Sequence, residues 1–206
     1  MVSAANIAGH VAVADPTAGD QRMLLHGVSW KDYVILRELL DRPGLRMTYL
    51  RGALELMSPS RTHELHKKNI ARVLELYAHV AGLDLYGYGS TTFKNEAAAR
   101  GLEPDECYVV GAPLGEVPHL AIEVVHTTPL LDKLAVYAGL GVREVWVFRD
   151  GAFTVFILSA ETASYAPADR SAILPALDLS MIARYAVRED TPQALRELEA
   201  ELRRTS

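Results

Sequence analysis

The sequence predicts an α/β (α+β) fold in which helices flank a mixed central β-sheet. The segment 119–125 is almost wholly apolar, which is typical of a strand buried on both faces of a sheet. A short helical segment at 130–138 and a β-rich run at 143–148 follow it. A helix between two such strands allows them to pair in parallel, whereas the short connections elsewhere in the chain favour antiparallel neighbours.

Helices and short strands are predicted to alternate before this unit. Ser29 can cap a helix that the Pro43-Gly44 pair stops. After Ser60, apolar residues recur at steps of three and four up to Gly82, which is the pattern of an amphipathic helix. The predicted helices cover 30–40 and 60–82, and the predicted strands cover 45–50, 53–57, 84–88, 91–94 and 106–110.

Capping and turn residues divide the rest of the chain. Thr128-Pro129 is a suitable cap and first turn for the helix at 130–138. Asp150-Gly151 predicts a turn before the next strand. The remaining predicted elements are a strand at 153–158 and helices at 178–186 and 191–204.

Length and composition predict one domain. The chain has 206 residues, of which 50% are hydrophobic and 23% charged, as in a globular domain with a sizeable core. Residues 1–22 lack the features of a secretory signal, so we expect a mobile tail on a domain that covers 23–206. No apolar run approaches the roughly 20 residues of a membrane span. Cys107 is the only cysteine, which excludes an intrachain disulfide and fits the reducing cytoplasm.

The net charge of −5 argues against nucleic-acid binding through bulk positive charge. A local basic patch is nevertheless predicted on the long helix after Ser60, where Arg61, Lys67 and Lys68 are candidates for contact with phosphates. The alternative interpretation is that these cations form a solvated helix face.

Two carboxylates stand out because of the strands beside them. Glu123 lies in the apolar strand, where a carboxylate is almost never fully buried without a partner. Asp105 follows Pro104 and leads into the strand at 106–110. Adjacent strands can present one carboxylate each at the same sheet edge, and such a pair chelates a hard cation such as magnesium. The alternatives are that Glu123 pairs with an Arg or Lys and that Asp105 is a turn residue.

Lys133 is the third candidate, in a predicted helix that is otherwise nearly all apolar. Helical geometry puts Lys133 on the same face as Leu130 and Tyr137. The alternative is a lysine whose stem lies along apolar surface while its ammonium reaches water.

These residues together resemble a known family. The chain is similar to the Uma-two family of proposed restriction endonucleases, within the PD-(D/E)XK nuclease superfamily, over roughly residues 45 to 180. The ordered combination is more specific than any one piece. The resemblance rests on Gly52 to Pro59, His63-Glu64, Glu103-Pro104-Asp105, Ile122-Glu123-Val124, Lys133 with Tyr137, Gly141-Val142 and Glu144-Val145-Trp146.

The resemblance implies a restriction-endonuclease-like core and assigns roles within it. It implies that Asp105 and Glu123 bind the metal, and that Lys133 steadies the attacking water or the developing charge. The superfamily places that lysine two residues after the acidic residue, where this chain has Val125, and Lys133 on the following helix takes its place.

One position departs from the family. Many relatives have a Glu in the first strand of the N-terminal block, and here the corresponding residue is Thr48. A third carboxylate would then come from Glu64, which is favoured because superfamily members often hold an acidic residue on that helix, or from Glu55.

The leading functional prediction is a magnesium- or manganese-dependent endonuclease that hydrolyses DNA, as a homodimer, in the cytoplasm. Thr48 and the negative net charge favour an alternative, a catalytically silent nuclease-fold module that binds nucleic acid or protein. A third interpretation is a metal-dependent hydrolase of small phosphoesters.

Overall fold

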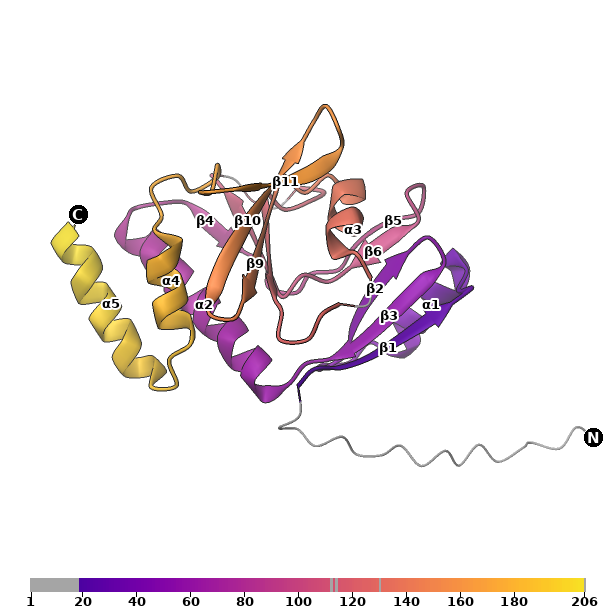
Figure 1. Cartoon of the computed structure of the whole chain (residues 1–206), viewed down its shortest axis with the longest axis horizontal. Coiled ribbons are helices and arrows are strands. Elements are labelled where there is room, and N and C mark those ends of the chain that lie inside the picture. The colour runs from indigo at the N-terminus through magenta and orange to yellow at the C-terminus, as the bar shows by residue number, and fades with distance from the viewer. Residues whose placement is uncertain (1–18, 112, 114, 130, 206) are drawn as a thin grey trace, which may run out of the picture.

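The structure, a computed structural model, describes residues 19–111, 113, 115–129 and 131–205. Two β-sheets and five helices make up this part of the chain (Figure 1). One sheet carries α1 at one end of the molecule, and α2, α4 and α5 lie at the other end (Figure 1). None of the described helices has the length and apolar character that crossing a bilayer requires.

The smaller sheet is antiparallel throughout and has the strand order β1-β3-β2-β6-β5. Helix α1 (Trp30–Leu39) begins after Ser29, whose hydroxyl accepts a hydrogen bond from the Asp32 backbone N–H. Tyr33 of α1 packs against Met47, Tyr49 and Leu54 of the sheet. The strands are β1 (Gln21–His26), β2 (Arg46–Leu50), β3 (Ala53–Ser58), β5 (Phe93–Asn95) and β6 (Arg100–Leu102).

The larger sheet is mixed and has the order β11-β10-β9-β8-β7-β4, with β8 and β9 parallel and the other neighbours antiparallel. This confirms the mixed sheet and the parallel pair that the sequence predicts. Helix α3 (Lys133–Leu140) connects the parallel strands. The strands are β4 (Leu85–Gly87), β7 (Glu106–Val110), β8 (Leu120–Val124), β9 (Glu144–Arg149), β10 (Ala152–Ser159) and β11 (Ser164–Ala168).

The two faces of the larger sheet have separate cores because successive side chains of a strand point to opposite faces. Ile122 and Val124 of β8 belong to the large core with α2 (Arg61–Val80), α4 (Leu179–Ala186) and α5 (Thr191–Thr205). Ala121 belongs to a smaller core with Val136 and Tyr137 of α3. Glu123 therefore points toward the α3 face.

The structure differs from the sequence prediction at several elements. Gln21 and Arg22 lie in β1 rather than in the tail predicted for residues 1–22, of which 1–18 fall outside the described residues. Strands β1, β6 and β11 are not predicted from the sequence, and the strands form two sheets instead of one. Strand β6 has only three residues and contains Gly101, so its composition carries no β-signal; its pairing with β2 and β5 makes it a strand.

Helix α3 begins at Lys133 and not at the predicted position 130. The capping residue is Asp132, whose carboxylate accepts a hydrogen bond from the Ala135 backbone N–H at 3.0 Å. Thr128-Pro129 therefore lies in the loop before the helix. The later start makes Lys133 the first helical residue, at the edge of the smaller core.

Replacing Gly101 by alanine is expected to lower the free energy of unfolding by about 1–3 kcal/mol through overpacking. A Cβ at Gly101 would lie 2.4 Å from the Tyr33 hydroxyl oxygen and 2.9 Å from Cζ of the same ring. Tyr33 is fully buried and stacks on Tyr49 with ring centroids 4.8 Å apart, so its ring cannot move away from a new methyl group without disturbing this packing. Urea denaturation measures the loss.

Gly115 provides the matched control, since a Cβ there would meet nothing within 4 Å. Gly115→Ala is expected to change the free energy of unfolding by less than about 0.5 kcal/mol. Equal stabilities for the two variants would contradict the close packing between Gly101 and Tyr33.

Candidate active site

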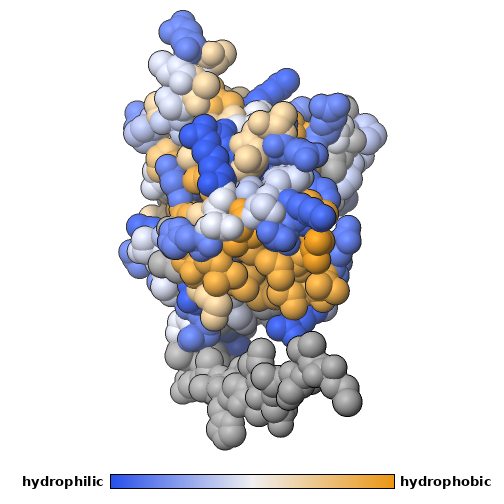
Figure 2. Space-filling view, turned by 90° about the vertical axis from the view of Figure 1, so that its right-hand side faces the viewer, coloured by the Kyte–Doolittle hydropathy of each residue, from blue (hydrophilic) through white to orange (hydrophobic). Residues whose placement is uncertain are grey.

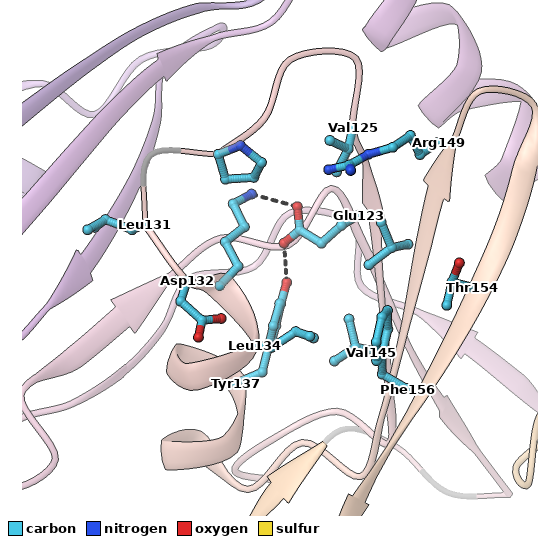
Figure 3. Close-up of a pocket in the computed structure, with 13 residues that line it drawn as sticks. Glu123, Val125, Leu131, Asp132, Leu134, Tyr137, Val145, Arg149, Thr154 and Phe156 are labelled. Atoms are coloured by element: carbon cyan, nitrogen blue, oxygen red, sulfur yellow. Dashed lines mark hydrogen bonds and ion pairs between the residues drawn. The ribbon is translucent and has the colours of Figure 1, made fainter. Parts of the chain in front are cut away.

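Glu123 is held by two side chains of α3. The carboxylate is 2% exposed, near the end of β8. Lys133 Nζ donates a hydrogen bond to Glu123 Oε2 at 2.6 Å, and the Tyr137 hydroxyl, one helical turn later, donates to Oε1 (Figure 3). Residues four apart lie on the same helix face, so α3 presents both donors together. The face predicted to combine Lys133 with Tyr137 is confirmed; Leu130 lies outside the described residues.

Asp105 lies at the same edge of the larger sheet. It directly precedes β7, whose Glu106 pairs with Ile122, so Asp105 is the next residue toward Glu123. Its Oδ2 accepts a hydrogen bond from the Val124 backbone N–H at 2.8 Å. The structure thus brings together the two carboxylates and the ammonium group of Lys133 that the sequence singled out.

A buried histidine links Asp105 to the N-terminal segment. His63, near the start of α2, is fully buried; its Nε2 lies 3.0 Å from Asp105 Oδ1 and its Nδ1 lies 3.2 Å from Asp20 Oδ2. Asp20 Oδ1 also accepts a hydrogen bond from the Ser60 backbone N–H at 3.0 Å. The sequence analysis does not predict this Asp20–His63–Asp105 chain of contacts, because Asp20 falls in the predicted tail and no role is assigned to His63.

The charges around Glu123 depend on one another. Burial raises the pKa of Glu123, and the Lys133 charge opposes that increase. Burial alone would lower the pKa of Lys133, but the carboxylates of Glu123 and Asp105 outweigh burial and raise it. Burial and the Glu123 charge raise the pKa of Tyr137 well above its ordinary value, so its hydroxyl keeps the proton that it donates. Glu123 therefore accepts from two groups that hold their protons firmly.

The contacts of His63 raise the pKa of the histidine and lower the pKa values of the two acids beside it. Burial alone would lower the pKa of His63, but hydrogen bonds to Asp105 and Asp20 raise it to about 9. Burial alone would raise the pKa of Asp105, but the hydrogen bond and charge of His63 hold it well below its ordinary value. Burial alone would raise the pKa of Asp20, but the hydrogen bond between His63 and Asp20 lowers it to about 2. At neutral pH His63 is a cation between two carboxylates.

Glu55 is the predicted third carboxylate that the structure places near the site. Its side chain is 1% exposed, forms an ion pair with Arg22, and accepts a hydrogen bond from the Leu131 backbone N–H at 3.0 Å. Glu55 pairs with Thr48 across β2 and β3, and directly opposite residues share a sheet face. The carboxylate of Glu55 thus reaches the sheet face of Thr48 from β3, the strand next to β2.

Glu64 lies away from this cluster. Its side chain is 46% exposed and lies 3.9 Å from Arg46 and 3.4 Å from Lys67. The structure therefore does not bring this predicted catalytic residue to Glu123. The reason is helical geometry: successive residues are turned by about 100° around the helix axis, so Glu64 points outward where His63 points inward.

The predicted phosphate contacts also lie outside the cluster. Arg61 and Lys68 are exposed on α2, and Lys67 pairs with Glu64. Lys67 and Lys68 act on the charge of Glu106, which faces α2, and they do not line the cavity beside Glu123. Their proposed role in nucleic-acid binding stays a prediction.

A cavity of about 310 Å³ opens beside Glu123 and Lys133. Its walls are mostly apolar and come from β8, β9, β10 and α3 (Figure 3). Arg149, at the end of β9, lines it with an exposed side chain that has no ion pair within the described part of the chain. The other lining residues include Val125, Leu131, Leu134, Val145, Val147, Thr154 and Phe156.

The donor set at this edge suits a hard divalent cation. Asp105 and Glu123 offer carboxylate oxygens, and an oxygen that accepts one hydrogen bond retains a second lone pair. Magnesium needs only one or two carboxylates and completes its shell with water. The described residues contain no group of three or more His, Cys, Asp or Glu side chains arranged to hold a metal ion. A cation here would therefore depend on the Asp105–Glu123 pair.

The comparison with protein families identifies the family of the chain. The chain matches the model of the Uma2 family, described as "Putative restriction endonuclease", over residues 30–184. No curated protein matches the chain. The family match spans well over half of the 206 residues and includes Asp105, Glu123 and Lys133. This chain therefore belongs to the Uma2 family and has a restriction-endonuclease-like α+β fold.

Proposed function

We propose that the protein is a magnesium- or manganese-dependent endonuclease that hydrolyses phosphodiester bonds in DNA. The observation that carries the proposal is the convergence of Asp105, Glu123 and Lys133 from three separate segments, with Glu123 and Lys133 lining one cavity. Buried ionisable groups with shifted pKa values in such a place are typical of functional sites. Membership of the Uma2 family supports a nuclease over an unrelated hydrolase.

Each residue has a distinct part in this proposal. Asp105 and Glu123 would hold the metal ion, which when bound stabilises charge on the phosphoryl group and acidifies water. Lys133 is the cation that donates a hydrogen bond to the attacking water or to a phosphoryl oxygen. Tyr137 fixes Glu123 from the other side, and His63 fixes Asp105.

A local charge balance supports a polyanionic substrate. Four buried carboxylates, Asp20, Glu55, Asp105 and Glu123, face three cations, Arg22, His63 and Lys133, which formally leaves one negative charge. A divalent ion would change that sum to one positive charge, which one phosphodiester would neutralise. Arg149, which lines the cavity, adds a further cation that would contact the phosphate backbone of DNA. We place the activity in the cytoplasm, which the single buried Cys107 favours.

The test is conversion of supercoiled plasmid to nicked or linear DNA by the purified protein with magnesium or manganese. Asp105→Asn and Glu123→Gln are each expected to reduce the cleavage rate by about 10²-fold or more, because each removes a charge on which the cation depends. Glu64→Gln, which removes a carboxylate of α2 outside the cavity, is expected to leave the rate unchanged.

The outcomes separate the candidate functions. Cleavage that survives both Asp105→Asn and Glu123→Gln would remove these residues from the mechanism. DNA binding without turnover, with or without metal, would replace the proposal by the catalytically silent module. Hydrolysis of a chromogenic phosphodiester with indifference to DNA would identify a small phosphoester as the substrate.

A further inference from the structure

Large hydrophobic side chains are exposed on α1 and β1. Met23 is 57% exposed, Ile35 42% and Leu39 74%, and these are three of the six large hydrophobic residues that are exposed in the described part of the chain. Figure 2 shows hydrophobic side chains gathered in one broad patch on the side of the molecule that carries α1. Such a patch, surrounded by polar residues, commonly marks a protein–protein interface.

The patch is hollowed beside α1. Trp30, Val34 and Ile35 line an open hollow of about 690 Å³ between α1 and the end of β5. Lys94 and Glu96 form its other border. A protruding side chain from a partner therefore has apolar surface to cover here.

Two charged residues flank the exposed apolar residues of the helix. Lys31, Ile35 and Glu38 are spaced by four and three residues, so they lie on one face of α1. Lys31 and Glu38 are both exposed, and neither has an ion pair or hydrogen bond with any described residue. The face thus carries one unpaired charge of each sign, on either side of Ile35.

We infer that this face is a twofold-symmetric interface with a second copy of the chain, in which the two α1 helices pack antiparallel. With the axis between Val34 and Ile35, Lys31 of each copy lies opposite Glu38 of the other. Val34 then lies opposite Ile35 of the second copy. Because a twofold interface repeats each contact, the arrangement forms two opposite-charge pairs around an apolar centre.

The neighbouring registers support the same arrangement. A shift by one turn toward the C-terminus would instead place Lys31 opposite Arg42, which repel each other. A shift the other way would place Lys31 opposite Val34. Among these registers only the first pairs every charge with its opposite.

The test measures the molar mass of the full-length protein by sedimentation over a concentration series. The wild type is expected to dimerise from its 22.6 kDa chain. Lys31→Glu and Glu38→Lys are each expected to weaken the dimer roughly tenfold or more, because each puts like charges opposite one another twice. The double variant Lys31→Glu/Glu38→Lys restores both pairs with reversed signs and is expected to dimerise within about threefold of the wild type.

Ile35→Asp tests the apolar centre of the interface and is expected to give a monomer. Glu199→Lys, a charge reversal of a similarly exposed residue on α5, is the control that leaves the dimer unchanged. Thermal unfolding of each variant shows that the chain still folds. A wild type that stays monomeric at every concentration, a dimer that survives Ile35→Asp, or a double variant as weak as the single ones would overturn the inference.

Discussion

Removing either partner of the buried Glu123–Lys133 pair is expected to cost about 3–5 kcal/mol of unfolding free energy, because each change leaves one charge buried without its counterion. Glu123→Gln keeps an acceptor for the Tyr137 hydroxyl but leaves the ammonium of Lys133 unpaired. Lys133→Met leaves the carboxylate of Glu123, which is 2% exposed, beside Asp105. The double variant removes both charges and is expected to be within about 2 kcal/mol of the wild type.

A double-mutant cycle by urea denaturation measures this coupling. The control is the surface pair Arg184–Glu201, whose side chains are 59% and 34% exposed and whose coupling is expected to stay below about 1 kcal/mol. Effects of Glu123→Gln and Lys133→Met that simply add would show that the two groups do not depend on each other.

The double variant is expected to unfold with nearly the same free energy as the wild type, and this expectation bears on function. If two apolar or uncharged residues serve stability as well as the charged pair does, then stability alone does not explain why Glu123 and Lys133 are buried here. A site that holds a metal ion and orients a phosphodiester does explain it, because the charges are then used when the substrate binds. Nuclease activity and unfolding free energy should therefore respond differently: the double variant is expected to recover stability and remain inactive.

The local part of this site could be predicted from the sequence. Glu123 interrupts an apolar strand, Asp105 precedes the neighbouring strand, and Lys133 interrupts an apolar helix, so each stands out against its own segment. The structure joins them because β7 and β8 are adjacent and α3 leads out of β8. These are short-range consequences of strand pairing and of one crossover connection.

The long-range part of the site could not be predicted in the same way. Asp20 and Arg22 reach it through the pairing of β1 with β3, and no periodicity in residues 19–26 indicates that pairing. His63 and Glu64 are adjacent in the chain, and only the packing of α2 decides which of them turns inward. The sequence offers Glu55 as an alternative to Glu64. Choosing between them requires the register of β2 with β3, which pairs Glu55 with Thr48.

Between pH 7 and 9.5 the protein is expected to lose about 2.5 kcal/mol of unfolding free energy as His63 loses its proton. The folded state holds the pKa of His63 at about 9, against an ordinary value of 6.5. Below pH 6.5 both states are protonated and the stabilisation is complete; above it the unfolded chain releases the proton first, so stability falls until pH passes 9. The difference between the two pKa values corresponds to about 3 kcal/mol.

His63 dominates between pH 7 and 8.5. Above that range Cys107 also contributes, because burial raises the pKa of its thiol from 9.0 to about 12 and only the unfolded chain releases this proton near pH 9. Burial raises the pKa of Glu106 to about 7, so its effect on stability is complete near neutral pH. Burial lowers the pKa values of His66 and His126, whose contributions therefore change below pH 6.5. Urea denaturation at closely spaced pH values measures the slope, and His63→Gln is expected to be less stable than the wild type at pH 7 and nearly flat from pH 7 to 8.5. A wild-type slope that persists in His63→Gln would mean that another group carries it and that His63 is not the cation between Asp20 and Asp105.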